Sequence, residues 1–129
     1  MSDCVLDASA VLAYLNDETG AAQVAGVLEK GGAIIGAVNF AEVAAKLISL
    51  GVSQDVAAQV MQSLEMQVIP LDEETAWMSA KLIWIAKPLG LSLGDRCCLA
   101  LGMRKGLPVL TADRAWASLA SEIEVRVIR

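Results

Sequence analysis

The chain has 129 residues, with 10 Lys and Arg, 15 Asp and Glu and no histidine, and its formal net charge is −5 at pH 7. This length suits one domain, residues 1–129, built around a single hydrophobic core. The composition excludes histidine acid–base catalysis, histidine-ligated zinc and the Ser–His–Asp triad, and it does not suit a general electrostatic grip on nucleic acid.

Short apolar runs alternate with longer helical segments along the chain, which predicts an α/β fold with a parallel sheet. In the first half, the pattern predicts strand Cys4–Leu6, helices Ala10–Leu15 and Ala21–Glu29, strand Ala33–Gly36, helix Phe40–Leu50 with Asn39 as its N-cap, and a helix from Ser53 to about Leu64. In the second half, it predicts strand Gln67–Leu71, a long helix from Asp72 to Lys87, helix Leu93–Arg104, strand Pro108–Leu110, a short helix, and edge strand Glu124–Ile128. The sum is a Rossmann-like three-layer α/β/α sandwich with about five mainly parallel strands.

No segment is expected to cross or enter a membrane. The most apolar stretch, residues 33–52, contains Glu42 and Lys46, and a membrane-spanning helix rarely carries two charges at its centre. The first residues lack the basic head and apolar core of a signal peptide. Cys97 and Cys98 are adjacent, which is poor geometry for a disulfide, so we expect reduced thiols and a cytoplasmic protein.

Four acidic residues stand in apolar surroundings. Asp7 and Asp113 follow the first and fourth predicted strands, and Glu42 and Asp95 lie near the starts of two predicted helices. Open α/β sheets place their ligand crevice at the carboxyl ends of the strands. A buried carboxylate costs several kcal/mol unless it is paired or binds a cation. Because basic partners are few nearby, a shared metal ion is the simplest arrangement for all four.

Each of the four acids also fits a helix cap. Glu42 and Asp95 stand three residues after Asn39 and Ser92, which is the spacing of a capping box, and the other two acids precede short helices. Asp72 also follows a strand, but it heads a long helix with further acids in the first turn, so it is interpreted as an ordinary cap outside the site. Spacing alone leaves both interpretations open.

Four motifs in order resemble those of PIN domains: Val-Leu-Asp-Ala-Ser-Ala-Val at 5–11, Asn-Phe-Ala-Glu-Val at 39–43, Leu-Ser-Leu-Gly-Asp-Arg-Cys-Cys-Leu-Ala at 91–100 and Pro-Val-Leu-Thr-Ala-Asp-Arg-Ala-Trp at 108–116. Small PIN domains of this kind are typically VapC-type toxins of VapBC toxin–antitoxin pairs. The resemblance implies the sandwich described above and a magnesium- or manganese-dependent endoribonuclease that cleaves RNA and is neutralised by a cognate antitoxin protein.

The resemblance also implies roles for individual residues. The catalytic and metal-binding set would be Asp7, Glu42, Asp95 and Asp113, and the supporting residues would be Ser9, Asn39 and Thr111. Magnesium keeps several waters and takes few carboxylates. Direct ligation is therefore assigned to Asp7 and Asp95, with water-mediated binding or a second metal for the other two. The alternative for the three supporting residues is local backbone capping.

The composition also points to partners. Hydrophobic residues make up 56% of the chain, and a small domain cannot bury such an excess alone, so we expect a homodimer, unless the many alanines inflate the count. Trp77 and Trp84 lie seven residues apart on one predicted helix face, which favours core or interface packing over base stacking. An antitoxin would lay an apolar segment into a groove near the early helices. Several basic residues either line an RNA path or are solvated surface charges: Arg96, Arg104, Lys105 and Arg114.

Three other functions fit parts of this sequence. One is a PIN-domain nuclease of RNA processing outside any toxin system, and another is a PIN-like module that binds RNA or protein without cutting. The intact set of acids argues against the second. A phosphoaspartate receiver would need a paired acid near the first strand and a lysine just after a late strand, and the segments around Asp7 and Thr111 supply neither clearly.

Overall fold

The computed structural model describes residues 2–119 and 123–129. Within them lies a five-stranded sheet with the strand order β3-β2-β1-β4-β5, and every neighbouring pair is parallel. The strands are β1 (Cys4–Leu6), β2 (Ala33–Gly36), β3 (Gln67–Ile69), β4 (Val109–Thr111) and β5 (Val125–Val127). The predicted parallel α/β sheet is confirmed, and so is the edge position of the last strand.

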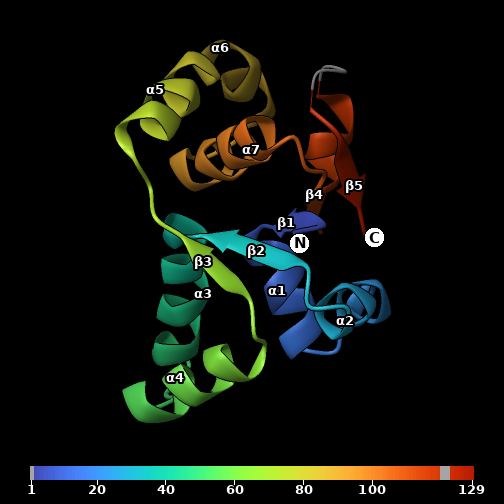
Figure 1. The fold of residues 1–129 in the computed structure, drawn as a ribbon, viewed down its shortest axis with the longest axis vertical. Coiled ribbons are helices and arrows are strands. Elements are labelled where there is room, and N and C mark those ends of the chain that lie inside the picture. The colour runs from blue at the N-terminus through green and yellow to red at the C-terminus, as the bar shows by residue number, and fades with distance from the viewer. Residues whose placement is uncertain (1, 120–122) are drawn as a thin grey trace.

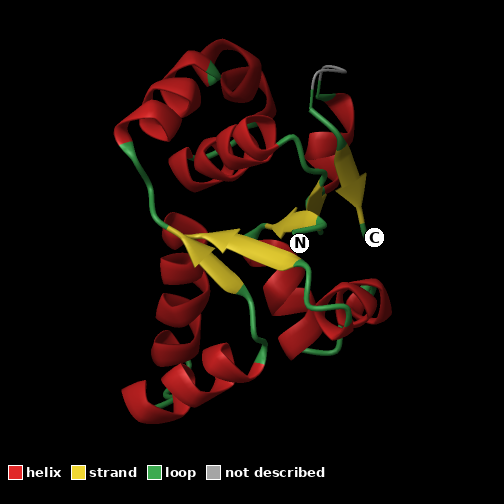
Figure 2. Ribbon diagram, viewed as in Figure 1, coloured by secondary structure: helices red, strands yellow, loops and turns green. Residues whose placement is uncertain are grey.

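Helices cover both faces of this sheet, as Figures 1 and 2 show. One face carries α1 (Ala8–Leu15), α2 (Ala21–Glu29), α3 (Ala37–Ser49) and α4 (Gln54–Ser63). The other carries α5 (Glu73–Lys81), α6 (Ile83–Ala86), η1 (Lys87–Leu89), α7 (Leu93–Lys105) and η2 (Arg114–Ser118). The predicted three-layer sandwich is therefore correct.

The strands separate two hydrophobic cores by simple alternation. In β1, Leu6 belongs to the core under α1 and α3, whereas Val5 belongs to the core under α7. Leu110 and Val109 of β4 divide in the same way. Successive side chains of a strand point to opposite faces, so a strand covered by helices on both faces has to be apolar throughout. This explains why the central strands are short continuous apolar runs.

Several predicted boundaries are wrong. The helix α1 begins at Ala8 rather than Ala10, and β4 covers Val109–Thr111 rather than Pro108–Leu110. The third helix begins at Ala37, so Asn39 lies inside α3 and is not its N-cap, a position that Gly36 occupies. The strand β3 ends at Ile69 rather than Leu71, because Pro70 has no N–H to continue the ladder. The predicted long helix is broken at Leu82, which is buried and bonds back to Ser79 in a tighter turn.

Local caps and ion pairs hold the helices in place. The Ser53 hydroxyl accepts a hydrogen bond from the Val56 N–H at 3.2 Å, as expected for the start of α4. Asp72 caps α5 and receives Arg104 from the end of α7 at 2.7 Å, and Arg104 also reaches Glu74 at 2.9 Å. Hydrogen bonds from Thr75 and then from Arg104 hold the pKa of Asp72 below its ordinary value. Arg104 thus ties α7 to α5.

The cysteines Cys4, Cys97 and Cys98 are buried and unpaired, which confirms the expectation of free thiols. None of the helices in the described ranges is long and apolar enough to span a membrane.

Gly102 allows α7 to approach β4 closely. A Cβ at this position would lie 2.5 Å from Val109 Cγ2 and 3.3 Å from the Leu107 carbonyl oxygen. We expect Gly102→Ala to lower the free energy of unfolding by about 1–3 kcal/mol, because the helix and strand must separate. Urea unfolding measures this change. Gly26→Ala in α2 is the control, since a Cβ there meets nothing within 4 Å, and an equal effect of the two substitutions would contradict this explanation.

Candidate functional site

The strands β1 and β4 end side by side, with Leu6 paired to Leu110. The next residue after β1 is Asp7, which caps α1 by accepting a hydrogen bond from the Ala10 N–H at 2.8 Å. Because parallel strands end at the same edge of the sheet, Asp7 faces Thr111 at the end of β4. The first acid of the predicted set therefore lies where such folds place a ligand, and it is also a helix cap.

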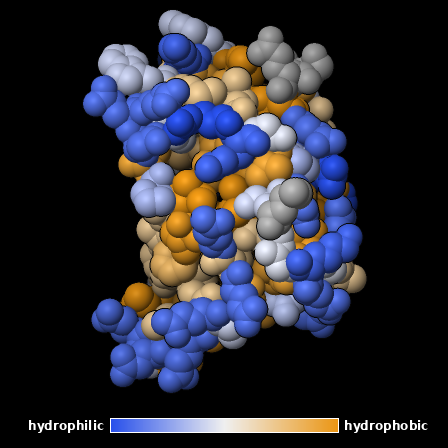
Figure 3. All heavy atoms as spheres, in the orientation of Figure 1, coloured by the Kyte–Doolittle hydropathy of each residue, from blue (hydrophilic) through white to orange (hydrophobic). Residues whose placement is uncertain are grey.

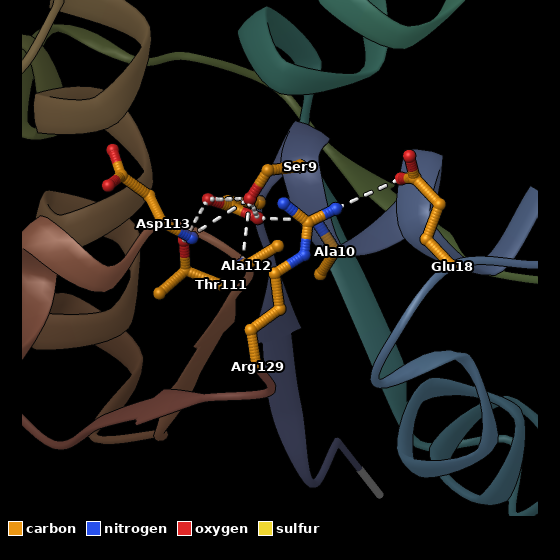
Figure 4. A network of polar contacts seen from close by, with 8 residues as sticks. Ser9, Ala10, Glu18, Thr111, Ala112, Asp113 and Arg129 are labelled. Atoms are coloured by element: carbon orange, nitrogen blue, oxygen red, sulfur yellow. Dashed lines mark hydrogen bonds and ion pairs between the residues drawn. The ribbon is translucent and has the colours of Figure 1, made fainter. Parts of the chain in front are cut away.

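Asp7 is buried and surrounded by hydrogen-bond donors, with an exposed fraction of 3%. The Ser9 hydroxyl lies 2.8 Å from Asp7 Oδ1 and 2.9 Å from Oδ2, and the Thr111 hydroxyl donates to Oδ2 at 2.6 Å (Figure 4). Burial raises the pKa of Asp7 to about 6, although these hydrogen bonds pull it down. The charge of Asp95 raises this pKa further. The site thus holds a carboxylate that a nearby cation would stabilise.

Ser9 and Thr111 also bind the backbone that follows β4. The Ala112 N–H donates to the Ser9 hydroxyl at 2.9 Å, and the Asp113 N–H donates to the Thr111 hydroxyl at 3.0 Å. Each hydroxyl therefore accepts from one segment and donates to Asp7, which fixes the direction of both O–H bonds. Ser9 and Thr111 therefore hold the Asp7 carboxylate in place through their hydroxyl groups.

Asp113 caps the short helix η2, because its carboxylate accepts a hydrogen bond from the Ala115 N–H at 2.9 Å. Its side chain is exposed beside the buried Thr111 (Figure 4). The capping interpretation of Asp113 is therefore observed. A cap at this position leaves the carboxylate at the same edge of the sheet as Asp7.

Glu42 is held against the start of α7 by Asn39. The Asn39 amide donates to Glu42 Oε1 at 2.9 Å and to the Gly94 carbonyl oxygen at 3.0 Å. Asn39 is buried, and its Oδ1 has no hydrogen-bond partner within the described residues. A Cβ on Gly94 would lie 2.7 Å from both carboxylate oxygens of Glu42, so only glycine leaves room for this group. Asn39 therefore positions Glu42 instead of capping the helix.

Asp95 forms the predicted capping box at the start of α7. Its Oδ2 accepts a hydrogen bond from the Ser92 N–H at 2.8 Å, while its own N–H donates to the Ser92 hydroxyl at 3.1 Å. The structural role of Asp95 is thus observed. Its charge nevertheless acts on Asp7, so it is also close enough to share an electrostatic environment with that group.

These four acids are called the carboxylate cluster: Asp7, Glu42, Asp95 and Asp113. Burial raises the pKa of the Cys98 thiol, and the charges of Asp7, Asp95 and Glu42 raise it further, so three of the four acids act electrostatically on the same buried thiol of α7. The fourth is linked to Asp7 through the Thr111 hydroxyl. In residues 2–119 and 123–129, no ion pair involves any member of the cluster.

The donor set of the cluster suits a hard divalent cation, because it consists of carboxylate oxygens without basic partners. In the conformation described, however, no three Asp, Glu, Cys or His side chains of the described residues come together tightly enough to hold a metal ion. Three of the carboxylates are instead hydrogen-bonded to backbone N–H groups at helix starts. Metal binding by this cluster stays a prediction.

Two residues near the cluster have no signal in the sequence. Gly94 is one, because its role depends on Glu42 of another helix. Arg129 is the other, and it lines a cavity together with Ser9 and Asp113. Of the basic residues suggested for an RNA path, Arg114 lines the same cavity, whereas Arg96 donates to the Ser79 carbonyl oxygen at 3.2 Å.

The two tryptophans Trp77 and Trp84 are exposed by 63% and 79%. They lie on different helices, α5 and α6, because the chain turns at Leu82. The two indole groups are therefore not packed in the core of this chain, and the interpretations that remain for them are a protein interface or base stacking.

The comparisons with known proteins agree with this fold. The model of the PIN domain matches residues 4–122. The fold is similar to that of a toxin–antitoxin complex from Klebsiella pneumoniae (19% identity, TM-score 0.70, 95% of this chain and 99% of that chain). It is also similar to DNA-bound VapBC from Salmonella typhimurium, with 14% identity and a TM-score of 0.76 over 100% of both chains. A third similar structure is VapBC-5 from Mycobacterium tuberculosis, with 23% identity and a TM-score of 0.59 over 100% of this chain and 99% of that chain. No curated protein matches the sequence.

Proposed function

This chain belongs to the PIN domain family, and from that premise we propose that it is a magnesium- or manganese-dependent endoribonuclease. The observation that carries the proposal is the burial of Asp7, which is only 3% exposed. Burial disfavours its uncompensated negative charge and raises its pKa to about 6. Asp7 lies at the carboxyl ends of two parallel strands, where the charge of Asp95 acts on it and the Thr111 hydroxyl links it to Asp113. A divalent cation would compensate this charge, and a phosphodiester is the kind of substrate that such a cation serves.

The carboxylate cluster would hold the metal, with Asp7 and Asp95 as direct ligands and the other two through water or at a second ion. When bound, Mg²⁺ lowers the pKa of a coordinated water and offsets the negative charge that builds on the phosphate oxygens during hydrolysis. Ser9 and Thr111 hold the Asp7 carboxylate in one orientation, since both donate to it. Asn39 does the same for Glu42. These supporting hydrogen bonds keep two oxygen donors fixed before any ion arrives.

We also propose that the protein is the toxin of a toxin–antitoxin pair. Support comes from the similar solved structures, several of which are toxin–antitoxin complexes. Apolar atoms reach the surface across the middle of the face in Figure 3. A cavity of about 350 Å³ between α3, α4 and β3 is lined mostly by apolar residues, among them Phe40, Met61, Met66 and Val68. It would suit an apolar segment of a cognate antitoxin.

A homodimer is part of the same proposal. Trp77 and Trp84 expose most of their indole surface next to Ile85, which is itself exposed by 42%. Exposed aromatic groups of this size are enriched in protein interfaces. Their position on α5 and α6 suits a contact between two copies of the chain in the cytoplasm.

The decisive experiment compares two acids that cap a helix after a strand. We expect Asp113→Asn to lower the cleavage of single-stranded RNA in Mg²⁺ by roughly 10- to 100-fold or more, because it removes a charge from the cluster. Asp72→Asn should stay within about twofold of the wild type, since Asp72 pairs with Arg104 outside the cluster. Gel-based cleavage assays measure both variants. The metal mechanism would be contradicted if the wild type cleaved RNA undiminished in EDTA, or if the two variants lost cleavage equally.

A further inference from the structure

A cavity of about 530 Å³ opens directly beside the carboxylate cluster. Its lining consists of Ser9, Ala112, Asp113, Arg114 and Arg129. Ser9 also contacts the buried Asp7, and Asp113 is itself a member of the cluster, so the cavity borders the carboxylate cluster directly. Any polymer that reaches the cluster from this side has to pass over these residues.

Two of the five lining residues are arginines, which is unusual in a chain with a formal net charge of −5. An anion that approaches the cluster is repelled by its carboxylates. Guanidinium groups offset this repulsion, and they bind phosphate oxygens in a planar, bidentate manner. The cavity therefore combines an entrance to the cluster with the side chain best suited to phosphate.

The position of Arg129 is fixed by the sheet. The Ile128 N–H donates to the Thr111 carbonyl oxygen at 2.9 Å, which continues the β4–β5 ladder one residue beyond β5. Ile128 is buried in the core under α1 and α2. The next residue, Arg129, is exposed and lies beside the segment that carries Asp113. The register of the edge strand β5 thus places the guanidinium group of Arg129 at the cavity.

In this position Arg129 forms an ion pair with Glu18. Its Nη2 lies 3.0 Å from Glu18 Oε1 (Figure 4), and the two side chains are 36% and 46% exposed. Glu18 follows α1 and is anchored by its own N–H, which donates to the Ala13 carbonyl oxygen at 2.8 Å. An ion pair as exposed as this contributes little to stability. A phosphate in the cavity can therefore replace Glu18 at small cost.

We propose that Arg129 and Arg114 bind a backbone phosphate of the RNA next to the one that is cleaved, and that Glu18 competes with this phosphate for Arg129. The inference rests on the proposed function for the identity of the substrate. It adds a phosphate subsite next to the carboxylate cluster, whose member Asp113 lines the same cavity, and a competing carboxylate from Glu18. Glu18 lowers the affinity for RNA, so removing its charge strengthens binding.

The chain contains a matched control pair. Arg126 Nη2 lies 3.4 Å from Glu124 Oε1, and both residues are exposed on or beside β5 but do not line the cavity. Neutralising Arg126 changes the net charge by the same amount as neutralising Arg129. Neutralising Glu124 likewise changes it by the same amount as neutralising Glu18. A difference between the pairs therefore reports the cavity and not the overall charge.

The test is the binding of a fluorescein-labelled single-stranded RNA in EDTA at low salt, measured by fluorescence anisotropy. We expect Arg129→Gln and Arg114→Gln each to weaken binding by roughly three- to tenfold and to lower the salt dependence by about one ion. Glu18→Gln should tighten binding by roughly two- to fivefold. The double variant of Glu18 and Arg129 should bind like Arg129→Gln alone, because the competitor has lost its target.

Arg126→Gln and Glu124→Gln should each leave the dissociation constant within about twofold of the wild type. The proposal is overturned if Arg129→Gln and Arg126→Gln weaken binding equally, if Glu18→Gln does not tighten it, or if the wild type binds no RNA. Because no metal is present, the measurement does not depend on cleavage. Binding that follows the expected pattern without any cleavage in Mg²⁺ would leave this subsite standing and overturn the nuclease.

Discussion

Asp7→Asn is expected to raise the free energy of unfolding of the metal-free protein by about 1–3 kcal/mol at pH 7, although it removes an acid from the proposed active site. Burial raises the pKa of Asp7 from 3.8 to about 6, and one pKa unit corresponds to about 1.4 kcal/mol. The folded protein therefore loses stability when Asp7 ionises. Asparagine keeps the shape, remains a good N-cap for α1 and carries no charge.

The same shift fixes the pH dependence. Because the pKa is raised in the folded state, the folded state binds more protons than the unfolded state between pH 3.8 and about 6. The contribution of Asp7 is thus favourable to folding at the acid end and is lost as the pH rises through this window. The difference in stability between Asp7→Asn and the wild type should grow from pH 4 to above pH 6 and then level off.

Urea unfolding in EDTA at a series of pH values measures this difference. Asp72→Asn is a control of opposite sign, since hydrogen bonds from Thr75 and Arg104 lower the pKa of Asp72 and its ionised form is favoured in the fold. That variant should be less stable than the wild type at neutral pH. A pH-independent difference for Asp7→Asn would show that the carboxylate is not destabilised by burial.

Magnesium should cancel or reverse this difference in stability between the wild type and Asp7→Asn. A ligand that binds only the folded state stabilises it by about 2.7 kcal/mol at a hundredfold excess over its dissociation constant. The wild type should gain this stability, and Asp7→Asn should gain little of it and lose RNA cleavage. An undiminished magnesium effect in the variant would remove Asp7 from the metal site.

Gly94→Ala should lower RNA cleavage while leaving the free energy of unfolding nearly unchanged. The added Cβ would meet the Glu42 carboxylate at 2.7 Å, so this exposed group has to leave its place beside Asn39. We expect the free energy of unfolding to stay within about 1 kcal/mol of the wild type, because alanine favours the helix. We expect RNA cleavage to fall by roughly 10- to 100-fold, as it does when a positioning contact at a metal site is lost.

Gly26→Ala is the matched control, since it adds the same methyl group to a helix where nothing lies within 4 Å. It should match or exceed the stability of Gly94→Ala and retain full cleavage. Equal cleavage by the two variants would mean that the place of Glu42 beside Gly94 has no part in the reaction.

The sequence by itself determined the features that depend on neighbours along the chain. The apolar runs at Cys4–Leu6 and Ala33–Gly36 predicted the buried strands, because a strand covered on both faces has to be apolar throughout. Ser53, Asp72 and the pair Ser92–Asp95 predicted helix starts, since a cap needs only a side chain and an N–H two or three residues away. The four acids were visible for the same reason, as polar groups at the ends of these elements.

The tertiary structure decided what depends on contacts between distant segments. Asn39 had the spacing of a cap, but its amide instead joins Glu42 to the Gly94 carbonyl of another helix. Leu82 ended a helix that local propensity would have continued, because its side chain is buried in the core. Arg129 reaches the cavity only through the register between β4 and β5, and a one-residue shift in register would turn every side chain of the strand to the other face.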